Sequence, residues 1–266
     1  MSDLIILKLG GSAITKKADN KFEMNYDVLN RAAQEIKNAK AEGVFKLIVI
    51  CGVGPFGHTN VIQYNINNGV ETDEQMEGVR ATNEACNFVG NECVNALKRA
   101  GLNAALVPAD KAALQENKKV DSFSIVKYQG LLEKEIIPVS TGIMVPDTEL
   151  TWSVISGDQI IAQLAKKLEP KKVLIGGDVD GIFTADPKED SKAELIEEIT
   201  KENISEVLSK VGESKAVDVT QGMKGKLDKL ANTLSGIPVE IFNLFVSGNL
   251  EKALLEQKIK GTKINL

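Results

Sequence analysis

The sequence of 266 residues has few of the residues that build metal sites and disulfide frameworks. It contains a single histidine, His58, and three cysteines, Cys51, Cys86 and Cys93. Structural zinc sites take four cysteine or histidine ligands at short spacings, and no such pattern can be built from these residues. An odd number of cysteines without paired spacing also argues against a disulfide framework. We therefore expect small, buried cysteines in a protein of a reducing compartment.

The chain also lacks an excess of positive charge and any long apolar run. Its 32 Lys and Arg residues against 37 Asp and Glu residues give a net charge of −5. Binders of nucleic acids or membrane surfaces usually carry a basic surface, so we expect neither kind of partner. No run approaches the roughly 18 apolar residues of a membrane span, and no basic segment followed by an apolar one opens the chain. We expect a soluble, cytoplasmic protein.

No linker, low-complexity tract or internal repeat divides the sequence, so we expect one domain over residues 1–266. Strand-like apolar runs alternate with segments of helical spacing, which is typical of a mainly parallel α/β sheet covered on both faces. The expected strands are 4–9, 46–51, 103–107, 136–140, 172–176 and 238–242, and the clearest helices are 26–42 and 75–100. The charged segment 186–215 predicts a solvated surface excursion.

Two glycine-rich turns follow two of these strands. The turn 52–58 ends in His58, and the turn 10–12 follows the first strand. Ligands of open α/β sheets bind beyond the carboxyl ends of strands, and backbone N–H groups in such turns can approach a phosphate. Either turn alone could be a chance match, with an exposed histidine in an ordinary turn. The two together favour a site that gathers phosphates.

Lysines near these turns could supply positive charge. Lys8 lies inside an apolar strand, where a charge is costly unless an anion pairs with it. Lys16 and Lys17 lie just past the first turn, and Lys226 precedes a helix expected over 227–235. The alternative for these three is an ordinary solvated lysine.

Acidic residues follow the expected strands of the second half. Asp178 and Asp180 lie in a glycine-rich turn, where they could hold Mg²⁺ through water or receive a ribose or base edge. A helix is expected over residues 160–168, and Ser156 or Asp158 lies near its N-terminus. For that pair the sequence favours a helix N-cap over a functional role.

The chain carries the segments 6–12 (ILKLGGS), 54–58 (GPFGH), 156–158 (SGD), 178–182 (DVDGI) with 186–187 (DP), 218–223 (DVTQGM) with Lys226, and 261–262 (GT). In this order they resemble the amino acid kinase superfamily, and within it the isopentenyl phosphate kinases, over residues 4–263. Several motifs in a fixed order are far more specific than one glycine-rich turn.

The resemblance implies the amino acid kinase fold, an open αβα sandwich with a mostly parallel central sheet of about eight strands. It implies a homodimer that transfers the γ-phosphoryl group of ATP, with Mg²⁺, to isopentenyl phosphate as the small phosphorylated substrate. The acceptor would bind in a lobe of residues 1–150 and the nucleotide in a lobe of residues 151–266. No separate protein metal site is expected.

The resemblance also assigns residues to these roles. The catalytic residues would be His58, which hydrogen-bonds the acceptor phosphate, and the phosphate-neutralising Lys8, Lys17 and Lys226. The nucleotide would contact Lys8, Gly10, Gly11, Ser12, Lys17, Asp178, Asp180, Gly181 and Lys226. The acceptor would contact Gly54, Gly57, His58 and Gly157.

The chemistry of His58 agrees with a phosphate acceptor. Phosphoryl transfer is mostly positioning and charge neutralisation. An alcohol acceptor benefits from a carboxylate that takes its proton, whereas a phosphate dianion needs a donor that offsets the repulsion between two anions. A histidine provides this whether neutral or protonated.

Three departures from the family pattern leave the acceptor open. Val53 and Pro55 alter the acceptor loop, because proline has no N–H to offer a phosphate. The segment 140–142 lacks the family's acid, and Gln221 replaces a glycine.

Two alternatives to isopentenyl phosphate therefore remain. One is a kinase for another phosphate, phosphonate or carboxylate acceptor, favoured by Asn83 and Asn87 in the helical segment 76–89 that is expected to wall the acceptor pocket. The other is a nucleotide-binding storage or regulatory protein without turnover, motivated by the acid missing near Thr141.

Overall fold

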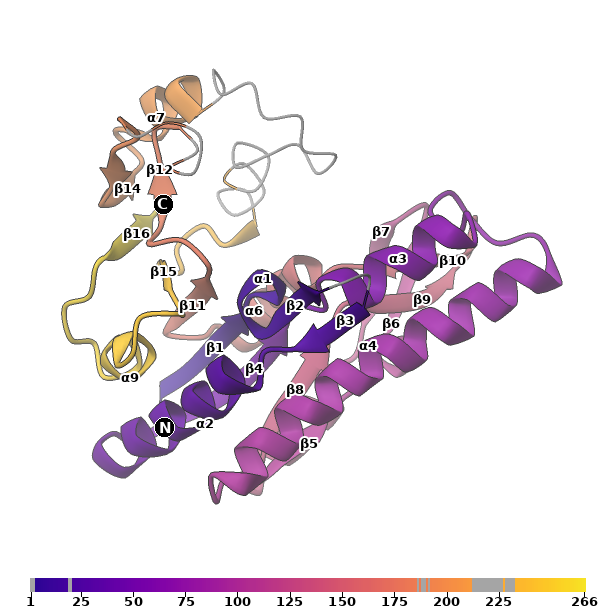
Figure 1. The fold of residues 1–266 in the computed structure, drawn as a ribbon, viewed down its shortest axis with the longest axis horizontal. Helices are drawn as coiled ribbons and strands as arrows, with labels where there is room; N and C mark the ends of the chain where they lie inside the picture. The colour runs from indigo at the N-terminus through magenta and orange to yellow at the C-terminus, as the bar shows by residue number, and fades with distance from the viewer. Residues whose placement is uncertain are drawn as a thin grey trace.

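The computed structural model describes residues 3–18, 21–185, 187, 190, 192–211, 227 and 233–266. Eight strands form one sheet in the order β14-β16-β15-β11-β1-β4-β8-β5 (Figure 1). Its neighbouring strands are parallel except for the antiparallel pair of β15 and β16. The first strand of the chain, β1, lies between β4 and β11, so both halves of the sequence contribute to the centre of the sheet.

The six strands expected from the sequence are all present in this sheet. The bounds are β1 (Asp3–Leu9), β4 (Phe45–Cys51), β5 (Ala104–Leu106), β8 (Ile137–Thr141), β11 (Lys172–Gly177), β14 (Glu198–Thr200), β15 (Val239–Asn243) and β16 (Gly261–Asn265). Sequence analysis missed β14, the edge strand, and β16, which pairs with β14 and β15. β14 is short, and buried and exposed residues alternate in β16, so neither carries a continuous apolar run.

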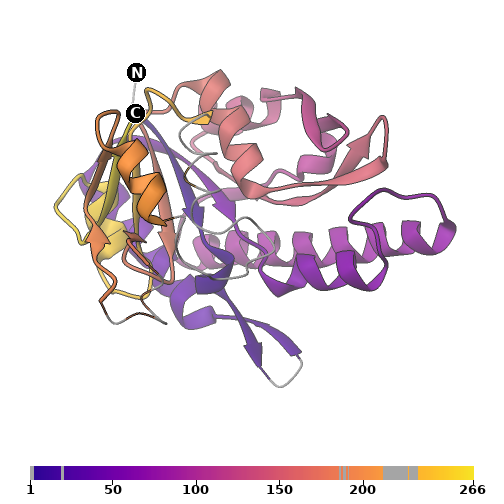
Figure 2. The same cartoon turned by 90° about the horizontal axis from the view of Figure 1, so that it is seen from above.

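Helices cover both faces of the sheet, as expected for an αβα sandwich (Figure 2). The helix bounds are α1 (Gly11–Ile14), α2 (Tyr26–Glu42), α3 (Pro55–Gln63), α4 (Asp73–Arg99), α5 (Val126–Glu133), α6 (Gly157–Leu168), α7 (Ile204–Val211) and α9 (Asn249–Leu254), with a 3-10 turn at Ala109–Lys111. Neither α4 nor any other described helix is long and apolar enough to cross a membrane.

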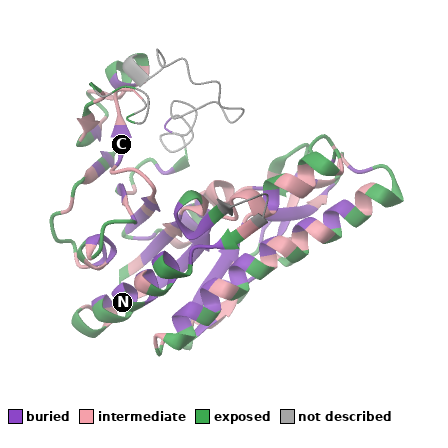
Figure 3. Cartoon of the chain, in the orientation of Figure 1, coloured by how far each residue is buried: buried purple, intermediate pink, exposed green. Residues whose placement is uncertain are grey.

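The alternation of side chains along the strands divides the core into two layers. In β1, Ile5, Leu7 and Leu9 pack with α2, α4 and α9, whereas Ile6 packs with α5 and α6. Successive strand residues point to opposite faces, so Lys8 lies on the α6 face together with Ile6. Figure 3 shows the resulting pattern, with buried strands in the centre and exposed outer faces on the helices.

Two helices begin at a capping box that is visible in the sequence. The side chain of Thr72 accepts from the Gln75 backbone N–H at the start of α4, and Ser156 does the same for Gln159 at the start of α6. In both helices the glutamine side-chain oxygen accepts a hydrogen bond from the backbone N–H of the capping residue. Ser156 is therefore the N-cap, and Asp158 lies inside the first turn of α6 and serves another purpose.

A smaller sheet, absent from the sequence prediction, lies beside α3 and the N-terminal half of α4. Its order is β10-β9-β6-β7, and its strands are β6 (Ala113–Glu116), β7 (Lys119–Phe123), β9 (Ile143–Asp147) and β10 (Thr151–Ile155). Two further hairpins are β2 (Thr15–Ala18) with β3 (Lys21–Met24), and β12 (Ile182–Phe183) with β13 (Leu195–Ile196).

One buried carboxylate, Asp147, ties the turns of the smaller sheet together. Its side chain is 4% exposed. It accepts bonds from the backbone N–H groups of Asn117, Lys118, Glu149 and Leu150 and from the Ser153 hydroxyl. Burial alone would raise the pKa of Asp147, but the hydrogen bonds from Ser153 and the backbone outweigh it and hold the pKa well below its usual value.

Part of the segment 186–215 forms helix and strand that the sequence did not predict. Its described part contains β13, β14 and α7, and it places Ile199 and Val207 in the core on the α6 face. The expectation of a solvated excursion is wrong for these residues. The described charged residues of the segment are exposed, and they outnumber the few apolar residues that reach the core.

The three cysteines are free and buried, as predicted. Burial raises the pKa of the Cys86 thiol to about 12. A thiol with so high a pKa is protonated near neutral pH and reacts poorly.

We expect Asp147→Asn to lower the free energy of unfolding by about 2–3 kcal/mol, because an amide NH₂ would face donors that the carboxylate now satisfies. A carboxyl group with a lowered pKa in the folded state stabilises that state above its unfolded pKa of about 3.9 and loses this effect as the pH falls further. Urea unfolding at pH 7 and at pH 3 measures both effects. The variant should lose less stability than the parent over this interval, and equal losses would contradict the assignment.

Candidate functional site

The glycine turns after β1 and β4 are in direct backbone contact at the carboxyl edge of the main sheet. The Gly52 N–H donates to the Leu9 carbonyl at 2.8 Å. A Cβ atom added to Gly11 would lie 2.6 Å from the Gly54 nitrogen, and one added to Gly52 would lie 2.3 Å from the Gly11 nitrogen. Real Cβ atoms do not come this close to backbone, so only glycine allows the two turns to meet.

His58 lies on the first turn of α3, which starts where the two glycine turns touch. The sequence suggested that His58 ends the turn, but the helix begins at Pro55, whose fixed φ suits the first helical position. Gly54 precedes it with φ +51°, and no side chain caps the helix. The His58 side chain is exposed, and Gly57 is buried against Val53 and Cys86.

Lys8 has an anionic partner in Asp158. Its Nζ atom lies 2.5 Å from Asp158 Oδ1. The pair forms because β1 turns Lys8 to the α6 face and Asp158 stands in the first turn of that helix. The side chains are 20% and 40% exposed, so both can still be reached from solvent.

Asp158 is a site residue that the sequence prediction missed. The signal was present, since a lysine inside an apolar strand requires an anion and Asp158 follows the Ser-Gly pair of a recognised motif. An acid therefore does reach the site from α6. The absence of an acid near Thr141 motivated the alternative without turnover. Lys8 nevertheless has a carboxylate partner, Asp158.

A third turn, after β11, joins the site next to the first. The Gly10 N–H donates to the Gly176 carbonyl at 2.8 Å, and the Ser12 hydroxyl donates to Asp178 at 2.9 Å. A Cβ atom on Gly181 would lie 2.4 Å from Thr262 Oγ1. The Thr262 hydroxyl accepts from the Ile182 N–H at 2.8 Å, so the closing Gly-Thr motif supports the turn after β11.

Asp180 lies in a cavity beyond this turn. The cavity measures about 230 Å³ and is lined by Asp178, Val179, Asp180, Phe183, Pro187 and Asn243. The Asp180 carboxylate accepts from Asn243 at 3.0 Å and pairs with Lys260 at 2.6 Å. The hydrogen bond from Lys260, followed by that from Asn243, lowers the pKa of Asp180.

The remaining predicted residues are placed only in part. Gly157 begins α6, where an added Cβ would lie 3.2 Å from the Ile50 side chain. Lys16 is exposed on β2. Lys17 lies on the same strand, but its side chain lies outside the described residues, as do Asp186, Lys226 and the segment 218–223. Among the residues that the structure describes, no group of three or more His, Cys, Asp or Glu side chains could hold a metal ion.

Two asparagines of α4 differ in what they can offer an acceptor. Asn83 makes two hydrogen bonds with the Met144 backbone, donating to its carbonyl at 3.1 Å and accepting from its N–H at 2.9 Å. In the part of the chain that the structure covers, Asn87 Oδ1 is buried and has no hydrogen-bond partner. Asn83 is therefore held by the smaller sheet, whereas the Asn87 oxygen has no partner of this kind.

Comparison with known proteins agrees with this geometry. The chain matches the amino acid kinase family over residues 3–243. It is 33% identical to the isopentenyl phosphate kinase of Methanothermobacter thermautotrophicus and 32% identical to that of Methanocaldococcus jannaschii, with 98% of both chains covered in each case. An X-ray structure of isopentenyl phosphate kinase is similar with a TM-score of 0.83 at 32% identity, covering 98% of this chain and 100% of that one. The chain belongs to the amino acid kinase family.

Proposed function

We propose that the chain is a kinase that transfers the γ-phosphoryl group of ATP to isopentenyl phosphate and forms isopentenyl diphosphate. The observation that carries the proposal is the contact between the turn at Gly11 and the turn that leads into the helix of His58. Nucleotide phosphates at the first turn would face an acceptor phosphate at the second. The relatives named isopentenyl phosphate kinase support this choice of acceptor.

In this proposal the acceptor phosphate binds at the start of α3. The N-terminus of a helix carries a partial positive charge and attracts anions. His58, in the first turn, donates a hydrogen bond to the acceptor phosphate and offsets its repulsion from the nucleotide. A phosphate oxygen is already an anionic nucleophile, so no carboxylate has to remove a proton from it.

The phosphoryl donor would lie over the turns that follow β1 and β11. Lys8, held by Asp158, would meet the transferring group, where charge spreads over the peripheral oxygens. Lys17 and Lys226 would add further positive charge. An acceptor oxygen attacks the γ-phosphorus while the bond to the bridging oxygen breaks, and ADP leaves with that electron pair.

Mg²⁺ suits this site as an ion carried by the nucleotide. It prefers oxygen ligands and usually binds through phosphates and water with one or two carboxylates. The Asp178 carboxylate and the Ser12 hydroxyl, 2.9 Å apart beside the Gly10 turn, form such an oxygen set. When bound, the ion would neutralise charge on the phosphates.

Three broader features complete the proposal. Residues 1–150 would form the acceptor lobe, with His58, and residues 151–266 the nucleotide lobe, with Asp178 and Asp180. Two copies would form a homodimer, by analogy with the family, and sedimentation or light scattering measures this. The buried free thiols favour a cytoplasmic enzyme.

A kinase for a phosphate acceptor with a polar tail is the second candidate. The buried, unpartnered Asn87 Oδ1 favours it, because a buried acceptor atom gains most from a ligand that donates a hydrogen bond. Partly buried apolar side chains of α3, α4 and β10 favour the apolar tail of isopentenyl phosphate: Val61, Tyr64, Met76 and Trp152.

The function is tested by incubating the protein with ATP, Mg²⁺ and a panel of acceptors, with ADP and product both quantified. The panel holds isopentenyl phosphate, a longer prenyl monophosphate, uridine monophosphate, a phosphonate and an amino-acid carboxylate. We expect the highest kcat/KM for isopentenyl phosphate. A higher kcat/KM for a polar acceptor would favour the second candidate over isopentenyl phosphate. ATP binding without transfer to any acceptor would contradict a kinase function.

His58→Ala should lower kcat/KM for isopentenyl phosphate by about 10²- to 10³-fold, the usual effect of losing one donor to a developing charge. The KM for ATP should change by less than about twofold, since the nucleotide binds at other turns. The matched control is Gln63→Ala, an exposed change on the same helix. If the kinetic parameters for ATP worsened as much as those for isopentenyl phosphate, His58 would not be a residue of the acceptor site.

Asp158→Asn should lower kcat by about 10- to 100-fold, because Lys8 would no longer be held at the position of the transferring group. Glu77→Gln removes the exposed Glu77–Arg80 ion pair and is the matched control, with kcat expected to stay unchanged. Steady-state kinetics with both substrates varied measures the effect. Unaltered kcat in the Asp158 variant would show that the pair has no role in transfer.

A further inference from the structure

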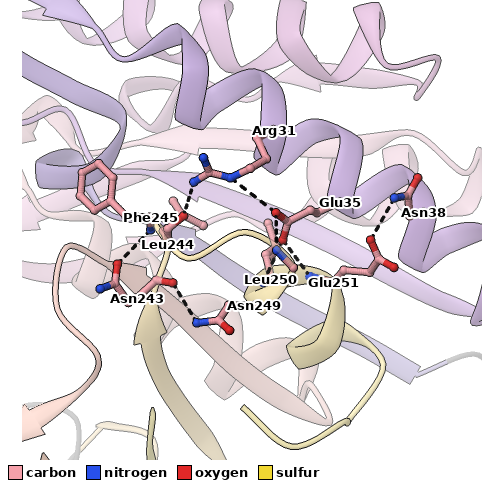
Figure 4. A network of polar contacts seen from close by, with 10 residues as sticks. Arg31, Glu35, Asn38, Asn243, Leu244, Phe245, Asn249, Leu250 and Glu251 are labelled. Carbon is pink, nitrogen blue, oxygen red and sulfur yellow. Dashed lines mark hydrogen bonds and ion pairs between the residues drawn. The ribbon is translucent and has the colours of Figure 1, made fainter. Parts of the chain in front are cut away.

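A buried carboxylate on α2, Glu35, lies outside the site described above. It is 6% exposed. Figure 4 shows it beside the chain that connects β15 to α9, more than two hundred residues later in the sequence. A buried charge of this kind is costly unless several hydrogen bonds compensate it, so its partners define its purpose.

Those partners are backbone N–H groups at the start of α9. Glu35 Oε1 accepts from Gly248 at 2.9 Å, and Oε2 accepts from Leu250 at 3.0 Å and from Glu251 at 3.2 Å. These N–H groups precede the first complete helical turn and have no carbonyl partner within the helix. The carboxylate thus fixes the end of the connecting loop 244–248 to α2.

Arg31, one helical turn before Glu35, fixes the other end of the same loop. Its Nη2 atom donates to the Leu244 carbonyl at 2.7 Å, and its Nε atom lies 3.5 Å from Glu35. The spacing of four residues places both side chains on one face of α2. Both ends of the loop are therefore held by a single rigid helix.

The loop in turn orients Asn243, the last residue of β15. The Asn243 side-chain oxygen accepts from the Phe245 N–H at 2.9 Å, which directs its NH₂ group to Asp180 Oδ1 at 3.0 Å. The Asn249 side chain donates to the Asn243 carbonyl at 3.2 Å (Figure 4). A shift of the loop would move Phe245 and release the Asn243 amide.

We propose that Glu35 is a positioning residue for the nucleotide site: by fixing loop 244–248 to α2, it orients the Asn243 amide and, through it, the Asp180 carboxylate in the cavity. Glu35 itself touches no substrate. The inference rests on the proposed function in one respect, that the ligand of this cavity is the nucleotide.

The test substitutes Glu35→Gln, which preserves the shape but places an NH₂ group against backbone donors. We expect the KM for ATP and the Kd of ADP by calorimetry to rise about fivefold to tenfold, a usual range for a group that acts through another. The KM for isopentenyl phosphate should change less than about twofold, because the acceptor site lies at α3.

Asp147→Asn is the matched control. Asp147 is also a buried carboxylate that accepts backbone N–H bonds, but it supports the smaller sheet. It should lower the stability without changing the Kd of ADP. If both variants weaken ADP binding equally, the effect is general destabilisation, and the proposal is overturned.

A double-mutant cycle tests the route through Asn243. Asn243→Ala alone should weaken ADP binding, and adding Glu35→Gln should weaken it no further, because residues that act in series are not additive. Full additivity would overturn the route. Arg31→Lys provides a milder change if the Glu35 variant does not fold, and it should shift the Kd of ADP in the same direction.

The outcomes separate this inference from the proposed function. A parent protein that binds ADP but transfers nothing to isopentenyl phosphate would contradict the function, while a selective loss of ADP binding in the Glu35 variant would still support the inference. An active parent with unchanged nucleotide parameters in that variant would overturn the inference alone.

Discussion

The contact between two glycine turns at the carboxyl edge of the sheet is the constraint on which the rest of the site depends. At Gly11 and Gly52 the two backbones are so close that no side chain fits between them. Parallel pairing of β1 with β4 delivers both turns to the same edge, and the helix of His58 starts at the contact. Two anions bound at these turns would be close enough to react, and the nearby cations would offset their repulsion.

Three charged groups at this contact and beyond it have defined partners. Lys8 is balanced by Asp158, Asp180 by Lys260, and Glu35 by backbone N–H groups and Arg31. A buried charge is costly without its partner. Any movement that separates the two is therefore unfavourable, and each pair holds the elements that carry it in one arrangement. In this way α6 holds Lys8 through Asp158, and α2 holds the loop that follows β15.

Sequence patterns predicted most strands of the main sheet and missed the strands of the smaller sheet. The six predicted strands carry continuous apolar runs, and α2 and α4 carry a clear apolar stripe. The smaller sheet was missed in part because Asp147 joins its turns through contacts with Asn117 and Lys118, which lie about 30 residues away and which no local pattern reveals. The Asn83 bond to Met144 was likewise invisible, since the two residues are 61 positions apart.

The sequence by itself determined the fold class, the order of the glycine turns and the need of Lys8 for an anion. These follow from local periodicity, from glycine positions and from the cost of a charge in an apolar strand. Only the tertiary structure decided that Asp158 is that anion, that α3 begins before His58, and that Glu35 on α2 holds the loop beside Asn243. Those contacts join residues far apart in the chain, and they exist only because sheet pairing and helix packing bring the segments together.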